Sequence, residues 1–170
     1  MELIPFKLKY ISDVISWVKS EEEMVQWAGS AFIWPLSQRQ FRNHQKKAKE
    51  ECPSLYPFAL VKDDKIIGYC EISDYRQQFN SAMLSRVIIA PRYRGKGYGG
   101  LLVKKAVKQA FSTLNLNRIA LGVFDFNKSA MNCYKKAGFE HEGTLRESAK
   151  AGKSYWNCHL MSILRKEWKC

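Results

Sequence analysis

This sequence of 170 residues lacks the features that mark membrane, disulfide-bonded and metal-binding proteins. No apolar run approaches the roughly 18 residues that a membrane-spanning helix needs, and no signal segment is recognisable at the N-terminus. The five cysteines are odd in number and lack C-x-x-C spacing, and the three histidines are scattered. We therefore expect a cytoplasmic protein with reduced thiols and without a disulfide framework or a metal site.

Several nucleotide-binding signatures are missing as well. The sequence contains neither the P-loop pattern G-x-x-x-x-G-K-[ST] nor the dinucleotide pattern G-x-G-x-x-G. It also lacks the signatures of RRM, KH, zinc-finger and helix-turn-helix modules. These absences argue against the common folds that read nucleic acid.

The charge balance is strongly basic, with a formal net charge of +12. Such a charge predicts a polyanionic partner, and either nucleic acid or a phosphate-bearing cofactor would satisfy it. Basic residues cluster over 92–108, but others are spread over 39–49, 135–136 and 146–153. Because this spread is typical of a solvated surface, we expect the cofactor and not nucleic acid.

The length suits one domain, and a content of 46% apolar and 26% charged residues is that of a soluble globular protein. Alternating or continuous apolar runs predict strands at 6–10, 55–61, 65–73, 82–90, 118–124, from 139 onward, and at 155–164. The continuous apolar character of 118–124 further predicts a strand buried on both faces.

Capping residues and apolar periodicity predict five helices. Ser20 followed by Glu23 forms a capping-box pattern, and Ser37 followed by Gln40 starts another helix. Ser12-Asp13, Asn127 and Gly138 supply further helix ends. The helices are expected at about 12–18, 20–29, 37–50, 98–114 and 128–137. Together the pattern predicts a single α/β domain with a mixed sheet.

The most informative stretch is Arg92–Gly100, which reads R-Y-R-G-K-G-Y-G-G and follows a predicted strand. Gly95, Gly97 and Gly99 permit positive φ and let a ligand approach the backbone. A glycine-rich turn at a helix N-terminus points free N–H groups at one spot, and the helix dipole adds positive charge there. That arrangement binds phosphate, although a basic surface turn would show the same glycines.

Residues 94–99 match R/Q-x-x-G-x-G/A, and the stretch resembles the acyl-CoA pyrophosphate loop of the GNAT-type N-acetyltransferases. A second segment, 127–139, is similar to the element N-x-x-A-x-x-x-Y-x-x-x-G-F of the same family. Two motifs in the order that the family shows indicate membership of the GNAT family more strongly than either motif alone. The segments 142–146 and 163–168 also resemble the branch that acetylates ribosomal-protein N-termini.

The resemblance implies a GNAT fold over 1–170, with a mixed sheet of about six to seven strands flanked by helices. Acceptor-side helices would lie at about 11–50 and the acetyl-CoA-binding core at about 82–140. Candidates for a wall of the acceptor cleft are Trp27, Phe32, Ile33 and Trp34, for each of which ordinary core packing is an equal alternative.

It also implies an acetyl-CoA site. The N–H groups of 95–100 would hold the pyrophosphate, and the edge of strand 87–89 would pair with the pantetheine arm. The N–H near Ile89 would hold the thioester oxygen. Asn127 would reach the arm, serve only as a helix cap, or do both. The implied acetyl-CoA-binding residues are Val87, Ile88, Ile89, Arg94, Gly95, Lys96, Gly97, Tyr98, Gly99, Gly100 and Asn127.

Tyr134 is the catalytic residue that the resemblance implies, as proton donor to the leaving thiolate. A core tyrosine is the alternative, and Ser129 is a weaker candidate donor. The resemblance implies no general base in this sequence, because Gly122 occupies the position where some family members have glutamate. Replacement bases are Glu71, Asp74, Asp125 and His141, although a surface or turn role is favoured for each.

The implied activity is direct acetyl transfer from acetyl-CoA to a primary amine, without metal. A lysine-like amine costs about 4.6 kcal/mol to deprotonate at pH 7 and an α-amine only about 1–1.4 kcal/mol, so a missing base favours an amine of low pKa. The acceptor stays open among a protein N-terminus, a small amine or amino acid, and an antibiotic amine. The alternative function is a non-catalytic CoA-binding sensor or scaffold. The oligomeric state is open between monomer and homodimer.

Overall fold

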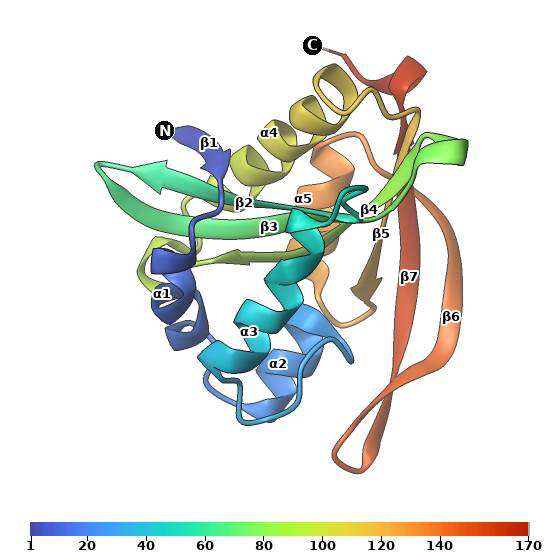
Figure 1. The fold of residues 1–170 in the computed structure, drawn as a ribbon. Coiled ribbons are helices and arrows are strands. Elements are labelled where there is room, and N and C mark those ends of the chain that lie inside the picture. The colour runs from blue at the N-terminus through green and yellow to red at the C-terminus, as the bar shows by residue number, and fades with distance from the viewer. Residues whose placement is uncertain (170) are drawn as a thin grey trace.

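The computed structural model describes residues 1–169, which form one seven-stranded mixed sheet with helices on both faces (Figure 1). The strand order is β1-β2-β3-β4-β5-β7-β6, and only β4 and β5 run parallel to each other. The strands are β1 Glu2–Pro5, β2 Leu55–Lys62, β3 Lys65–Arg76, β4 Ser81–Ile89, β5 Arg118–Phe124, β6 Glu140–Ala151 and β7 Ser154–Leu164. The α-helices are α1 Ile11–Ser16, α2 Glu21–Ala28, α3 Gln38–His44, α4 Tyr98–Ser112 and α5 Lys128–Lys136. The predicted α/β class and mixed sheet are confirmed.

The secondary structure predicted for the first residues of the chain is wrong. β1 lies at Glu2–Pro5 and pairs with β2, whereas a 3-10 helix occupies Leu8–Tyr10 inside the predicted strand 6–10. The apolar alternation there has another cause, because the ring of Phe6 packs 4.8 Å from the ring of Tyr69. α1 begins at Ile11 without a side-chain cap, so Ser12 and Asp13 lie inside the helix and do not cap it.

The next two helix starts are confirmed. The Ser20 hydroxyl accepts the N–H of Glu23 at 3.1 Å, and the Ser37 hydroxyl accepts the N–H of Gln40 at 3.3 Å. Each bond satisfies one of the N–H groups that a helix leaves free in its first turn. α3 ends at His44, six residues before the predicted end, and a 3-10 helix continues over Gln45–Lys49.

The sheet separates two apolar cores. In Figure 1, α1, α2 and α3 gather on one face of the sheet and α4 and α5 lie on the other. The core under α4 and α5 is mainly aliphatic and includes Leu102 and Val107 from α4. The core under α1–α3 is aromatic, with Phe32 and Phe41 stacked at 5.5 Å. Both helix layers are thus anchored to a rigid sheet.

β4 and β5 diverge after a short paired stretch. Their parallel pairing runs only from Ser81 opposite Arg118 to Met83 opposite Ala120, although β4 continues to Ile89 and β5 to Phe124. The edges that face each other beyond this point are not hydrogen-bonded to one another, and unpaired edges need another partner. The opening between the two strands is where a ligand can enter the sheet.

The prediction that β5 is buried on both faces is wrong. Ile119, Leu121 and Val123 are buried against the α4 and α5 side, but Gly122 is exposed. On the other face of the strand, Ala120 and Phe124 are only half-buried, and Gly122 and Phe124 line a cavity beside β4.

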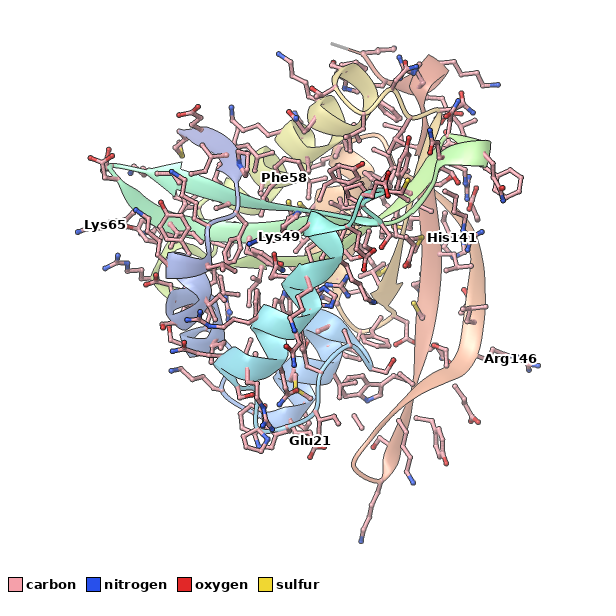
Figure 2. The ribbon with its side chains drawn as sticks, viewed as in Figure 1. Glu21, Lys49, Phe58, Lys65, His141 and Arg146 are labelled. Carbon is pink, nitrogen blue, oxygen red and sulfur yellow. The ribbon has the colours of Figure 1, made fainter. Side chains whose placement is uncertain are left out.

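Basic side chains are spread over the surface, as predicted. Figure 2 shows Lys65 at the turn between β2 and β3, and Arg146 projecting outward from β6 at the far side of the molecule. Residues 1–169 contain no helix with the length and apolar character that a membrane crossing requires.

Leu102→Ala tests the core under α4. Its side chain is fully buried, so we expect a loss of about 2–5 kcal/mol in the free energy of unfolding, from lost burial and the cavity left behind. Urea unfolding measures the change. Leu8→Ala is the control, because Leu8 is 40% exposed and should change stability by no more than about 0.5 kcal/mol. Equal effects of the two changes would contradict this packing.

Candidate active site

A cavity of about 350 Å³ lies beside the end of β4. It is bordered by residues that follow α1, by residues of α2 and by residues of α5. It is lined by Trp17, Val18, Glu23, Gln26, Trp27, Val87, Ile88, Ile89, Arg94, Gly99, Asn127, Ser129, Ala130, Cys133 and Tyr134. The fold thus brings together seven of the twelve residues that the sequence predicts for the site.

A second cavity of about 270 Å³ adjoins the first. It extends over Ser85 and Arg86 of β4 and over Gly122 and Phe124 of β5. Residues that line both cavities are Gln26, Trp27, Val87, Asn127, Ala130 and Tyr134. Tyr134 and Asn127 therefore border both cavities.

The glycine turn has the conformation that the sequence predicts for an anion cradle. Gly95 and Gly97 have φ of +73° and +80°, where other residues are strained, and Gly97 is the N-cap of α4. A Cβ added at Gly95, Gly97 or Gly100 would meet no protein atom within 4 Å. The turn leaves its N–H groups beside open space at the N-terminus of a 15-residue helix.

Basic side chains are held around this turn. The Arg94 Nε donates to the carbonyl of Ile89 at 3.0 Å, which orients the guanidinium toward the first cavity. The Nζ of Lys62 donates to the Tyr98 hydroxyl at 3.3 Å. Sequence reasoning missed Lys62, because it lies 36 positions away on β2 and matches no motif.

Tyr134 is 9% exposed and lies on α5, with its ring 5.9 Å from that of Phe139. Burial raises the pKa of its hydroxyl well above the ordinary value, so the group is protonated at neutral pH. No hydrogen bond to this hydroxyl is formed within residues 1–169, and no fully buried side-chain polar atom there lacks a partner. The hydroxyl is therefore accessible from the cavities. Asn127 caps α5 by accepting the N–H of Ala130 at 3.1 Å, which confirms its helix-cap role.

A β-bulge shapes the wall of the opening on β4. Glu71 pairs with Ser85 and Tyr69 with Ile88, so Arg86 and Val87 together oppose the single residue Cys70. Arg86 has φ of +50°, and its carbonyl accepts the indole N–H of Trp27 at 2.8 Å. Bulges redirect side chains at functional sites, and this one is tied directly to α2.

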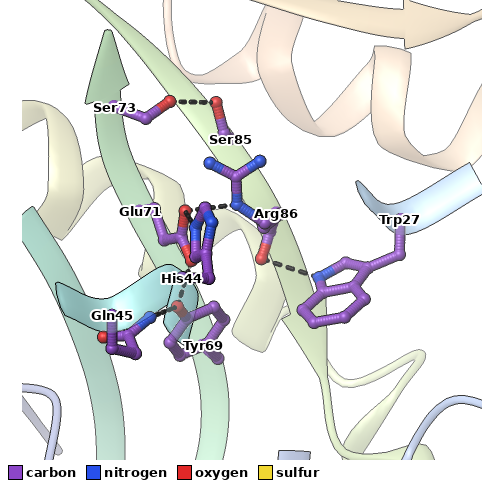
Figure 3. A network of polar contacts seen from close by, with 8 residues as sticks. All are labelled: Trp27, His44, Gln45, Tyr69, Glu71, Ser73, Ser85 and Arg86. Atoms are coloured by element: carbon purple, nitrogen blue, oxygen red, sulfur yellow. Dashed lines mark hydrogen bonds and ion pairs between the residues drawn. The ribbon is translucent and has the colours of Figure 1, made fainter. Parts of the chain in front are cut away.

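Glu71 supports the bulge from beneath (Figure 3). Its carboxylate is fully buried and contacts the Arg86 Nε, the Tyr69 hydroxyl and the Nε2 of His44, the last at 3.0 Å. Burial alone would raise the pKa of Glu71. Hydrogen bonding with His44 and the charge of Arg86 oppose this effect, and the pKa lies below the usual value. The carboxylate is charged at neutral pH and connects α3, β3 and β4.

From the sequence, all four candidate bases are expected to be surface or turn residues. For Glu71 this expectation is wrong, because its side chain is buried. Asp74 is exposed on β3, Asp125 accepts the side-chain amide of Asn157 at 2.8 Å, and His141 lies on exposed β6 beside His159. Within the described residues, none of the four lines either cavity. Gly122 does line the second cavity.

The four residues predicted to form a wall of the acceptor cleft have different surroundings in the structure. Trp27 lines both cavities, and Phe32 is buried in the aromatic core. Ile33 and Trp34 are exposed by 77% and 36% in the loop before α3. Cavity residues that sequence reasoning missed include Trp17 and Val18 after α1, Glu23 and Gln26 of α2, and Arg86 in the bulge, where no motif exists.

Known proteins resemble this chain in sequence and in fold. The profile of the acetyltransferase (GNAT) family matches residues 21–139. Spermidine N(1)-acetyltransferase of Vibrio cholerae is 33% identical over 61% of this chain and 59% of its own length. The Escherichia coli K12 enzyme of that name is 34% identical over 65% of this chain and 59% of its own length.

The match thus spans about three fifths of these relatives. The solved structure of the Vibrio cholerae enzyme, in complex with CoA and spermine, superposes with a TM-score of 0.86 at 24% identity. It covers 98% of this chain and 96% of its own. That structure shares the fold.

Glu71→Gln tests the support beneath the bulge. The change leaves Arg86 without its buried counter-charge, so we expect a loss of about 3 kcal/mol in the free energy of unfolding at neutral pH. Because the folded pKa of Glu71 is lowered, its stabilisation is full above the ordinary carboxyl pKa of about 4.3 and is lost as the pH falls through the folded value.

The stability gap between the original chain and the variant should therefore narrow in acid. Urea unfolding at neutral pH and at about pH 3 measures the gap. Glu51→Gln, at an exposed position, is the control and should give no gap at either pH. A gap for Glu71→Gln that stays constant with pH would contradict the charged network.

Proposed function

Since the chain belongs to the acetyltransferase (GNAT) family, we propose that it transfers an acetyl group directly from acetyl-CoA to the primary amine of a small molecule. The observation that carries the proposal is the lining that two cavities share. The glycine turn contributes Gly99 to the first cavity, and Tyr134 lines both the first and the second. A donor and an acceptor can meet beside Tyr134.

Acetyl-CoA fits the first cavity, since the positive φ angles at Gly95 and Gly97 leave a cradle of free N–H groups for the pyrophosphate. Arg94 and Lys62 supply positive charge near that cradle. The unpaired edge of β4 from Val87 to Ile89 would bind the pantetheine arm. When bound, acetyl-CoA supplies a thioester carbonyl as the electrophile.

Tyr134 is the proposed proton donor to the departing thiol, because its hydroxyl is protonated and opens onto both cavities. Cys133 and Cys158 also line the cavities, but burial raises the pKa of each thiol. A protonated thiol is a poor nucleophile, which favours direct transfer over an acetylated cysteine.

The amine has no carboxylate base close by. Glu23 is the one acidic side chain that lines either cavity within residues 1–169, and its carboxylate already accepts the N–H of Lys19 at 2.8 Å. At position 122, a Cβ would lie 2.9 Å from the Cys158 sulfur, so a glutamate there would require Cys158 to move. We infer that the amine loses its proton to water, which favours amines of low pKa.

The named relatives favour a small amine as the acceptor. Both sequence relatives are named as spermidine acetyltransferases, which supports a small-molecule amine as the acceptor more than a ribosomal protein N-terminus. Membership of the branch that acetylates ribosomal-protein N-termini remains a prediction, and these relatives do not support it. Release of free CoA over a panel of amines tests the proposal, and a chain that binds CoA but acetylates nothing would be the sensor or scaffold.

Gly97→Ala should weaken CoA binding about tenfold or more. A side chain strains the left-handed backbone by about 1–2 kcal/mol, and relief of that strain would turn the N–H groups away from the phosphates. Calorimetry of CoA binding measures the effect. Gly152→Ala, in the turn between β6 and β7, has comparable strain at φ +57° and should leave CoA affinity unchanged. Unaltered binding by the Gly97 variant would disprove the cradle.

Tyr134→Phe should lower kcat about 10²-fold and leave acetyl-CoA affinity nearly unchanged, because the ring packing is kept and only the proton donor is lost. Tyr155→Phe is the control, since Tyr155 is 58% exposed. CoA-release kinetics across a range of pH measure the change. Equal turnover of the Tyr134 variant at every pH would remove this residue from the mechanism.

A further inference from the structure

We propose that the acceptor is an amine that also carries a carboxylate, as an α-amino acid does, and that the Arg86 guanidinium binds this carboxylate. The inference rests on the proposed acetyl transfer and names its substrate class. Arg86 and Tyr134 line the same second cavity. An anion bound by Arg86 would share that cavity with the proposed proton donor.

The guanidinium of Arg86 is only partly used by the protein. Its Nε contacts Glu71, but its two terminal nitrogens form no hydrogen bond within residues 1–169. No fully buried side-chain nitrogen or oxygen in that range lacks a partner, so both terminal nitrogens have some exposed surface, and Arg86 lines the second cavity. Figure 3 shows them turned away from Glu71.

The orientation of Arg86 is fixed before any ligand binds. Its side chain is 12% exposed, its backbone lies in the bulge, and its carbonyl is held by Trp27. Glu71, which is itself held by Tyr69 and His44, prevents the guanidinium from swinging. A planar group with two free, parallel N–H donors matches a carboxylate in two-point geometry.

The charge around the cavities also opposes a polyamine. Arg86 and Arg94 line them, whereas Glu23 is the one carboxylate that does so in the described chain, and it is exposed. Glu71 lines neither cavity and is paired with the Arg86 Nε, so its carboxylate is not presented to a cation in the cavities. A polyamine keeps further ammonium groups after one amine is deprotonated, and like charges in one cleft repel each other.

Matched acceptors test the proposal on the complete chain. The panel contains L-amino acids, their carboxamides, the corresponding decarboxylated amines, and spermidine and spermine. CoA release gives kcat/KM for each, corrected for the fraction of neutral amine. We expect at least one amino acid to exceed its own carboxamide and both polyamines by about 10- to 100-fold.

The two proposals fail in different ways. Polyamines or carboxamides acetylated as fast as the best amino acid would overturn this inference and leave acetyl transfer standing. Bound acetyl-CoA with no acetylation of any amine would overturn the proposed function and this inference with it.

A double variant tests whether Arg86 causes the preference for an acceptor with a carboxylate. Arg86→Gln combined with Glu71→Gln removes both charges, so no charge is left buried without its partner. We expect the ratio of kcat/KM between amino acid and carboxamide to fall to about 1, with CoA binding retained as the check on folding. Arg39→Gln, on the exposed face of α3, removes one positive charge elsewhere and should keep the original ratio. A ratio that survives in the double variant would overturn the role of Arg86.

Discussion

The divergence of β4 from β5 is the constraint on which the site depends. Two parallel strands that separate after three residue pairs leave main-chain groups without sheet partners in the middle of a protein. Such groups are costly unless something else satisfies them, so the opening is suited to a ligand with its own amide groups. α4 begins after the glycine turn that follows β4, and its first turn lies beside the end of β4 because Gly99 lines the first cavity with Val87, Ile88 and Ile89.

The bulge on β4 adds specificity to this opening. An extra residue in β4 gives Arg86 a left-handed backbone, and that conformation would be unstable without support. The support comes from three elements, since Glu71 of β3, His44 of α3 and Trp27 of α2 all contact Arg86 or its partner. The aromatic core under α1–α3 therefore has a second role, because it holds the network that orients one guanidinium in the cavity.

The sequence predicted the parts of this arrangement that depend on local chemistry. The glycine turn, the Ser20 and Ser37 caps and the class of fold follow from residues within a few positions of one another. Glu71, His44 and Arg86 are 15 to 42 positions apart. Glu71 and Arg86 meet across the bulged pairing of β3 and β4, and His44 contacts Glu71 from α3. Nothing near Glu71 in the sequence marks it as buried, and the strand 6–10 was mispredicted because core packing imitates strand alternation.

The contrast between fold and charge bears on how the acceptor is selected. A TM-score of 0.86 with a spermidine acetyltransferase means that the two chains share a fold, but at 24% identity most of their side chains differ. Shape alone admits many small amines, so discrimination among them comes from charge. In this chain the fixed charge at the acceptor side is a guanidinium whose counter-ion lies behind it, out of the cavity. A cation would meet that guanidinium first, whereas an anion would complete its hydrogen bonds.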